Sequence, residues 1–184
     1  MAHSQATISF TGKAGWLASI GLFVAALAFC LFSVRYQLGT MLGEVSDPQA
    51  PNASEIADAA VELSPRDPLT AWLKASTAYD PTREGAAGEY AALVEQVVRL
   101  SPWDTRWWVE LGRAREQSAD LIGAEAAYLR AIELAPNHSY PRWQFGNFLL
   151  RQERMDDALA ELRKSASVSS LYREQVYSVV WDFA

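Results

Sequence analysis

Few side chains in this 184-residue chain could do chemistry, and none of them forms a catalytic set. Asp156 and Asp157 are adjacent carboxylates, but they stand where a helix is predicted to begin and where the helix dipole favours acidic residues. The two histidines, His3 and His138, share no ligand spacing, so we expect no metal site. The sequence contains no Gly-rich phosphate loop, His-Glu-x-x-His motif or nucleophile elbow. We therefore expect no enzyme and no cofactor.

The net charge and the cysteine content narrow the class of protein further. A formal net charge of −6 argues against a nucleic-acid binder, because neutralising phosphates requires a concentrated basic surface. The single cysteine, Cys30, lies in an apolar segment and allows no disulfide within the chain. Half of the residues are hydrophobic, which is ample for a packed core.

Residues 14–34 carry no charge over 21 positions. A helix of that length spans about 30 Å, which is the thickness of the hydrocarbon core of a bilayer. Trp16 and Tyr36 stand near its two ends, where interfacial aromatic residues are common. We expect residues 14–36 to form a transmembrane helix and residues 1–13 to form a cytoplasmic tail.

Other interpretations of this segment stay open. A cleaved signal peptide would use the small residues 26–28, although the apolar run continues beyond them. A lipoprotein signal would end at Cys30, although Phe29 is larger than the residue usual before the lipidated cysteine. Lys13 and the α-amine flank one side and Arg35 the other, so the positive-inside rule favours a cytoplasmic N-terminus by about one charge. We therefore expect the helix to cross a bacterial inner membrane and the rest of the chain to lie in the periplasm.

Residues 37–54 are expected to form a linker between this helix and residues 55–184. Gly39, Gly43, the Asp47-Pro48 pair and Pro51 interrupt any regular pattern. Such a joint would let the rest of the protein swing near the membrane.

The remaining chain repeats itself. Similar six-residue endings close with a proline at Pro65, Pro102 and Pro136, and the last two of these prolines are 34 residues apart. A recurrence near 34 residues, with each helix ending before a proline, indicates stacked helical hairpins. The pattern predicts helices at 55–64, 67–79, 86–100, 104–117, 120–135, 138–152, 155–168 and 171–182.

The residues within these units resemble the tetratricopeptide repeat. One unit supplies Trp108, Leu111, Gly112, Ala124, Tyr128, Ala131 and Pro136 in register, and the next supplies Phe145, Gly146, Leu149, Ala158 and Leu162. Arg115 departs from the pattern, since a tyrosine is usual there. The resemblance implies an all-α protein: the transmembrane helix, a right-handed α-solenoid of about three hairpins, and a C-terminal helix. It also implies that Gly112 and Gly146 mark close helix crossings opposite Ala124 and Ala158.

The resemblance further implies that partner proteins bind on the concave face, which the first helix of each hairpin lines. Carried over in register, that face consists of Trp72, Arg106, Val109, Arg113, Tyr140, Trp143, Asn147 and Arg151. Arginine beside tryptophan suits an extended acidic peptide, whereas Trp72 and Trp143 could equally pack between helices. In the cluster Trp103, Trp107 and Trp108, the residues cannot all share one face, so at least one is a candidate contact for a partner.

The C-terminal helix is apolar on nearly every side. Tyr172, Val176, Val180 and Trp181 are expected to meet a partner protein or another copy of the chain, as in a homo-oligomer. The leading interpretation is a membrane-anchored scaffold of the bacterial cell envelope that holds machinery for polysaccharide assembly or secretion. A stoichiometric accessory subunit of a membrane complex is the alternative, and an assembly factor, as in cytochrome maturation, is a third.

Overall fold

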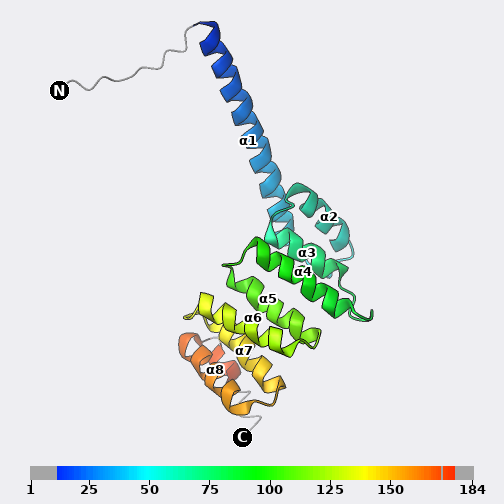
Figure 1. The fold of residues 1–184 in the computed structure, drawn as a ribbon, viewed down its shortest axis with the longest axis vertical. Coiled ribbons are helices and arrows are strands. Elements are labelled where there is room, and N and C mark those ends of the chain that lie inside the picture. The colour runs from blue at the N-terminus through cyan, green and yellow to red at the C-terminus, as the bar shows by residue number, and fades with distance from the viewer. Residues whose placement is uncertain (1–11, 171, 177–184) are drawn as a thin grey trace, which may run out of the picture.

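The computed structural model describes residues 12–170 and 172–176, and in that part of the chain every regular element is an α-helix (Figure 1). The helices are α1 (Lys13–Val45), α2 (Ala53–Leu63), α3 (Pro68–Ala78), α4 (Ala86–Leu100), α5 (Thr105–Gln117), α6 (Leu121–Leu134), α7 (Ser139–Arg151) and α8 (Met155–Val168). Residues 172–176 are also helical. The bounds of α2 to α8 lie within two residues of those expected, which confirms the all-α prediction.

Short polar residues start several of these helices. The side chain of Asp104 accepts a hydrogen bond from the backbone N–H of Arg106 (3.0 Å), and Asp120 accepts one from Gly123 (2.9 Å). Both bonds satisfy backbone donors that a first helical turn leaves unpaired. Asp67 stands in the same position before α3, whose first residue is Pro68.

Helices α3 to α8 form three hairpins that stack side by side (Figure 1). One buried cluster lies between α3, α4 and α5 and includes Tyr90, Val94 and Leu111. A second cluster is formed by residues of α5, α6, α7 and α8 and centres on Tyr128 and Phe148. Because each cluster joins residues of neighbouring hairpins, the core is continuous along the stack.

The two glycines expected at helix crossings do lie there. A Cβ atom on Gly112 would come within 2.8 Å of the Tyr128 ring, and one on Gly146 would come within 2.7 Å of Leu162 Cγ. The nearest facing groups are thus these larger side chains, rather than the alanines expected opposite the glycines. Ala124 and Ala158 are fully buried in the second cluster.

The prediction of a linker at residues 37–54 is wrong for residues 37–45, because α1 continues through them. The helix does not end near Tyr36 but continues to Val45, so only residues 46–52 separate α1 from α2. The glycines that suggested a break are instead contact positions. A Cβ atom on Gly39 would lie 2.7 Å from Ser64 Cβ, and one on Gly43 would lie 3.2 Å from Leu69 Cγ.

Hydrogen bonds fasten the end of α1 to α2. Ser64 is fully buried just after α2, and its hydroxyl donates to the carbonyl oxygen of Tyr36 (2.6 Å). The Arg35 guanidinium donates to the carbonyl oxygen of Glu62 (2.6 Å), where a cation complements the C-terminal end of a helix. The helix α2, expected to be unpaired, therefore forms a hairpin with the end of α1.

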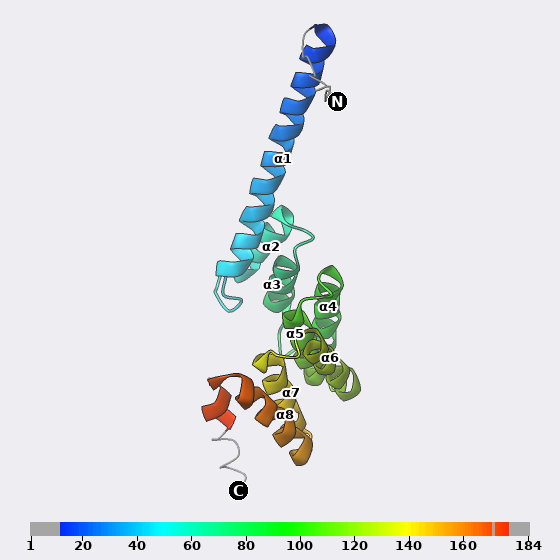
Figure 2. The ribbon, with the colours of Figure 1, turned by 90° about the vertical axis from the view of Figure 1, so that its left-hand side faces the viewer.

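The first part of α1 projects from the stack, and no other described helix packs on it (Figures 1 and 2). The large apolar side chains from Trp16 to Val34 are exposed. Within the described residues, α1 is the one helix that is long and apolar enough to cross a membrane.

Candidate protein-interaction groove

A groove runs along the side of the stack that the first helices of the hairpins form. It consists of three adjoining hollows of about 440, 290 and 540 Å³, and Trp72 lines all three. The end of α1 contributes to the first hollow, α3 and α5 to all three, and α7 to the second. We call this surface the groove; its main lining residues are Thr40, Gly43, Glu44, Asp67, Leu69, Trp72, Arg106, Trp107, Glu110, Arg113, Gln117 and Tyr140.

Aromatic rings form one wall of the groove. The rings of Trp72 and Trp107 lie with their centroids 6.1 Å apart at 41°, a tilted pair of the kind that stabilises aromatic contacts. Trp107 is only 5% exposed, whereas Trp72 is half-buried. Tyr140 adds a ring from α7. This wall offers flat apolar surface to a bound chain.

Among the described residues of the groove, three side chains carry a buried polar atom without a hydrogen-bond partner. The atoms are Asp67 Oδ2, Trp72 Nε1 and Trp107 Nε1. Leaving such an atom unpaired costs about 1 to 3 kcal/mol. Because the three atoms are themselves covered, they do not offer a bound chain a direct hydrogen bond.

The arginines expected to grip an acidic peptide are already paired within the chain. Arg113 lies 3.4 Å from Glu110. Arg151 donates twice to the Glu116 carboxylate, at 2.6 and 2.9 Å. That hydrogen bonding raises the pKa of the Arg151 guanidinium. Neither guanidinium is an open fork for an incoming carboxylate.

Arg106 is also paired, although it remains exposed at the rim. Its guanidinium lies 2.7 Å from the Asp104 carboxylate and 5.5 Å from the centroid of the Trp107 ring. The hydrogen bonds from Arg106 lower the pKa of the Asp104 carboxyl below its ordinary value. Beneath this rim, burial and the nearby Glu110 carboxylate raise the pKa of Tyr90, whose hydroxyl donates to Glu110 at 2.6 Å.

Of the other residues expected on the concave face, one is buried in the core and two make contacts on α7. Val109 is 1% exposed in the core, so it offers no surface to a partner, and its assignment to the face is wrong. Asn147 donates its amide to the carbonyl oxygen of Trp143 within α7 (2.8 Å). Trp143 packs instead on Tyr172, with ring centroids 5.4 Å apart. Trp143 thus joins α7 to the helical segment 172–176, which follows α8 in the chain.

Val176 belongs to this segment and is 5% exposed. The other two residues proposed for the C-terminal helix, Val180 and Trp181, lie outside the described residues.

Of the three clustered tryptophans, one is exposed. Trp103 is 77% exposed in the turn before α5, with the Arg130 guanidinium 5.8 Å from its ring centroid. Trp108 is half-buried and donates from Nε1 to the carbonyl oxygen of Pro102 (2.8 Å). Trp107 lies in the groove wall. The expectation that at least one of them is exposed is confirmed at Trp103.

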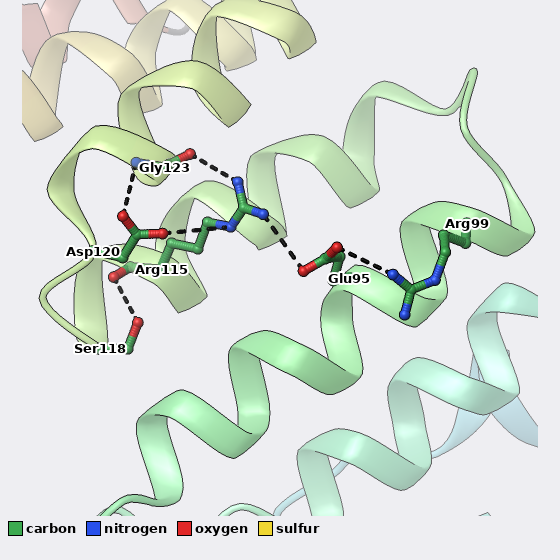
Figure 3. Close-up of polar contacts among 6 residues, drawn as sticks. All are labelled: Glu95, Arg99, Arg115, Ser118, Asp120 and Gly123. Atoms are coloured by element: carbon green, nitrogen blue, oxygen red, sulfur yellow. Dashed lines mark hydrogen bonds and ion pairs between the residues drawn. The ribbon is translucent and has the colours of Figure 1, made fainter.

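Arg115, which stands where the repeat usually has tyrosine, joins three helices (Figure 3). Its guanidinium donates to the carbonyl oxygen of Gly123 at 3.2 Å and to Glu95 at 3.5 Å, and it lies 3.8 Å from Asp120. The residue belongs to α5, while these partners belong to α4 and to the start of α6. Arg115 thus fixes the spacing of hairpins behind the groove.

Sequence reasoning missed the part of the groove that the end of α1 lines. Thr40 and Glu44 were assigned to the linker, and Leu69 was not singled out. The signal that could have found them is the spacing of Gly39 and Gly43, since residues four apart share one face of a helix.

Stacked hairpins with glycine crossings and a groove along their first helices are features of the tetratricopeptide-repeat fold. No family model matches the chain, and no curated protein matches it. Solved structures do resemble it, and one is TTC0263, a thermophilic tetratricopeptide-repeat protein of Thermus thermophilus. The TM-score is 0.62 at 19% identity, over 87% of this chain and 96% of that one.

Two MamA structures are also similar. A crystal structure of MamA has a TM-score of 0.57 at 14% identity, over 78% of this chain and 81% of that one. The fragment of MamA from residue 41 to the end, from Desulfovibrio magneticus RS-1, has a TM-score of 0.56 at 21% identity, over 74% and 75% of the two chains. At these identities the likeness is one of fold.

Proposed function

We propose that the chain is a membrane-anchored scaffold of the bacterial cell envelope, whose groove binds a segment of a partner protein. The observation that carries the proposal is the continuity of α1. Its first part is apolar and uncovered, while its last turns belong to the repeat stack. One rigid helix therefore joins a surface suited to lipid to a surface suited to proteins.

The exposed apolar part of α1 would be unfavourable in water. Each square ångström of apolar surface left in water costs about 25 cal/mol. The exposed large side chains between Trp16 and Val34 lie on all sides of the helix, and lipid covers all sides at once. We propose a single crossing of the inner membrane, with the N-terminus in the cytoplasm and the repeats in the periplasm. The basic residue Lys13 and the α-amine support this direction.

A partner segment would bind in the groove in extended form. The half-buried rings of Trp72 and Tyr140 suit an apolar anchor side chain. Since Arg113 and Arg151 are held by carboxylates of the chain itself, we no longer favour an acidic segment. Machinery for polysaccharide assembly or secretion is the setting we propose, since it combines membrane and soluble parts that must be held together.

Truncation tests the anchor. The full chain is expected to stay in the membrane fraction after alkaline extraction, and a chain that starts at Arg35 is expected to be soluble and folded. The second expectation follows because residues 35–45 still cover α2. As a control, a chain that starts at Asp47 lacks that cover and should lose protection of the α2 amides. Release of the full chain by alkaline extraction would contradict the anchor.

A second function is favoured by the rigid junction. Since α1 and α2 are fastened together, the array keeps one orientation relative to its anchor, which also suits a stoichiometric subunit of a membrane complex. Purification in mild detergent separates the two proposals. Membrane subunits in fixed ratio support the subunit, whereas varied partners in low ratio support the scaffold.

A further inference from the structure

The end of the groove beside α1 differs in charge from the rest. Among the described ion pairs, Arg106, Arg113 and Arg151 each have a carboxylate partner, and none of these partners is Glu44 or Asp67. Glu44 is exposed in the last turns of α1, and Asp67 is buried before α3. The cation that lines this hollow is Arg106, which pairs with Asp104 and also interacts electrostatically with Glu44, so one positive charge faces three carboxylates. This end therefore carries surplus negative charge.

The same hollow has room for a side chain. It measures about 440 Å³ and is lined by both Trp72 and Trp107. Trp72 is half-buried, so part of its ring is open to an occupant. An occupant that brings a cation would be attracted both to the nearby carboxylates and to the face of the Trp72 ring.

The position of this hollow along α1 limits where its occupant can come from. Thr40 follows the end of the apolar run at Val34 by six residues, and Glu44 follows it by ten. At 1.5 Å per residue, the hollow lies about 9 to 15 Å beyond the end of the apolar run. An extended chain that leaves the same membrane covers that distance in about three to five residues.

We infer that this end of the groove binds a juxtamembrane segment of another membrane protein, with a lysine or arginine within about five residues of that protein's own apolar span. The cation lies between Glu44 and Asp67 and against the Trp72 ring. The inference rests on the proposed function, because it requires both the anchor and the binding groove.

Photo-crosslinking in native membranes tests the inference. A photoreactive amino acid is placed in the full chain at Arg106 or at Gln117, two exposed positions at the groove rim. The same residue at Glu84, which is exposed and lines none of the hollows of the groove, is the control. Crosslinked peptides are then mapped to residues of the partner.

We expect crosslinks from Arg106 to map within about five residues of an apolar span and beside a lysine or arginine. The mapped segment is synthesised, and its Kd for the full chain in nanodiscs is measured. Glu44→Gln should raise that Kd about two- to fivefold, as for the loss of one partly exposed ion pair, and Glu84→Gln should leave it unchanged.

Crosslinks to a segment far from any membrane span, or a Kd unaffected by Glu44→Gln, would overturn the inference and leave the groove as a binding site. Crosslinks at neither groove position above the Glu84 control would overturn the proposed function, and the inference with it.

Discussion

Replacing Gly39 with alanine should loosen the junction between α1 and α2. The added Cβ would lie 2.7 Å from Ser64 Cβ and 3.0 Å from the carbonyl oxygen of Ala60, so the helices must separate. Such overpacking costs about 1 to 3 kcal/mol. Weakening the buried hydrogen bond from Ser64 to Tyr36 adds about 1 kcal/mol. The higher helix propensity of alanine returns about 1 kcal/mol. The net loss is about 1 to 3 kcal/mol.

Hydrogen exchange of the full chain in nanodiscs measures this loss where it occurs. The protected amides of α2 should exchange about five- to 150-fold faster, and those of α6 should be unchanged. Gly88→Ala is the matched control, because a Cβ on Gly88 meets nothing within 4 Å. If Gly39→Ala left α2 exchange equal to that of the control, the end of α1 would be a free linker and the packing argued above would be wrong.

Two further predictions concern the rest of the stack. Arg115→Ala should lower the free energy of unfolding in urea by about 1 to 2 kcal/mol, because the side chain joins three helices. Arg99→Ala removes a more exposed partner of the same carboxylate and should cost less than about 0.5 kcal/mol, so equal losses would contradict the bridging role. The hydrogen bonds from Arg106 lower the pKa of Asp104, so this group contributes stability above its unfolded pKa of about 4 that is lost as the pH falls. Asp104→Asn keeps a capping oxygen but has no carboxyl group to protonate. Between pH 7 and pH 3.5 it should therefore lose less stability than the original chain, by up to about 0.7 kcal/mol, and equal losses would contradict the assignment.

The repeats could be predicted from sequence because their signals are local and recur. Gly112 and Gly146 stand at the same place in successive units, and each lies where a side chain would meet its own hairpin partner. The ends of α2, α4 and α6 follow from Pro65, Pro102 and Pro136. Both signals act within a few residues, so they need no knowledge of distant contacts.

The junction could not be predicted in the same way because glycine has two opposite meanings. Gly39 and Gly43 suggested a break, since glycine lowers helix propensity by about 1 kcal/mol. In the fold they allow close packing against Ser64 and Leu69, which offsets that cost. The choice depends on what lies opposite, and that information is distant in the chain.

Four of the eight residues expected on the concave face line the groove, and the charge of that face was not predicted. Trp72, Arg106, Arg113 and Tyr140 do line it, as expected from the register of the repeats. The pairing of Arg151 with Glu116 joins residues 35 apart, so no local pattern shows it. A sequence shows how many arginines a face has; the fold decides how many are free.

The rigid junction gives the groove a fixed direction as well as a fixed height above the apolar span. In a helix, each residue turns the chain by about 100° and advances it by 1.5 Å. The number of residues between Val34 and Gly39 therefore sets which way the groove faces around the axis of α1, since Gly39 is locked against α2. A flexible linker would leave both quantities free, and any partner within reach could then bind. A continuous helix restricts the groove to partners that approach from one side at one height, so the length of α1 itself selects the partner.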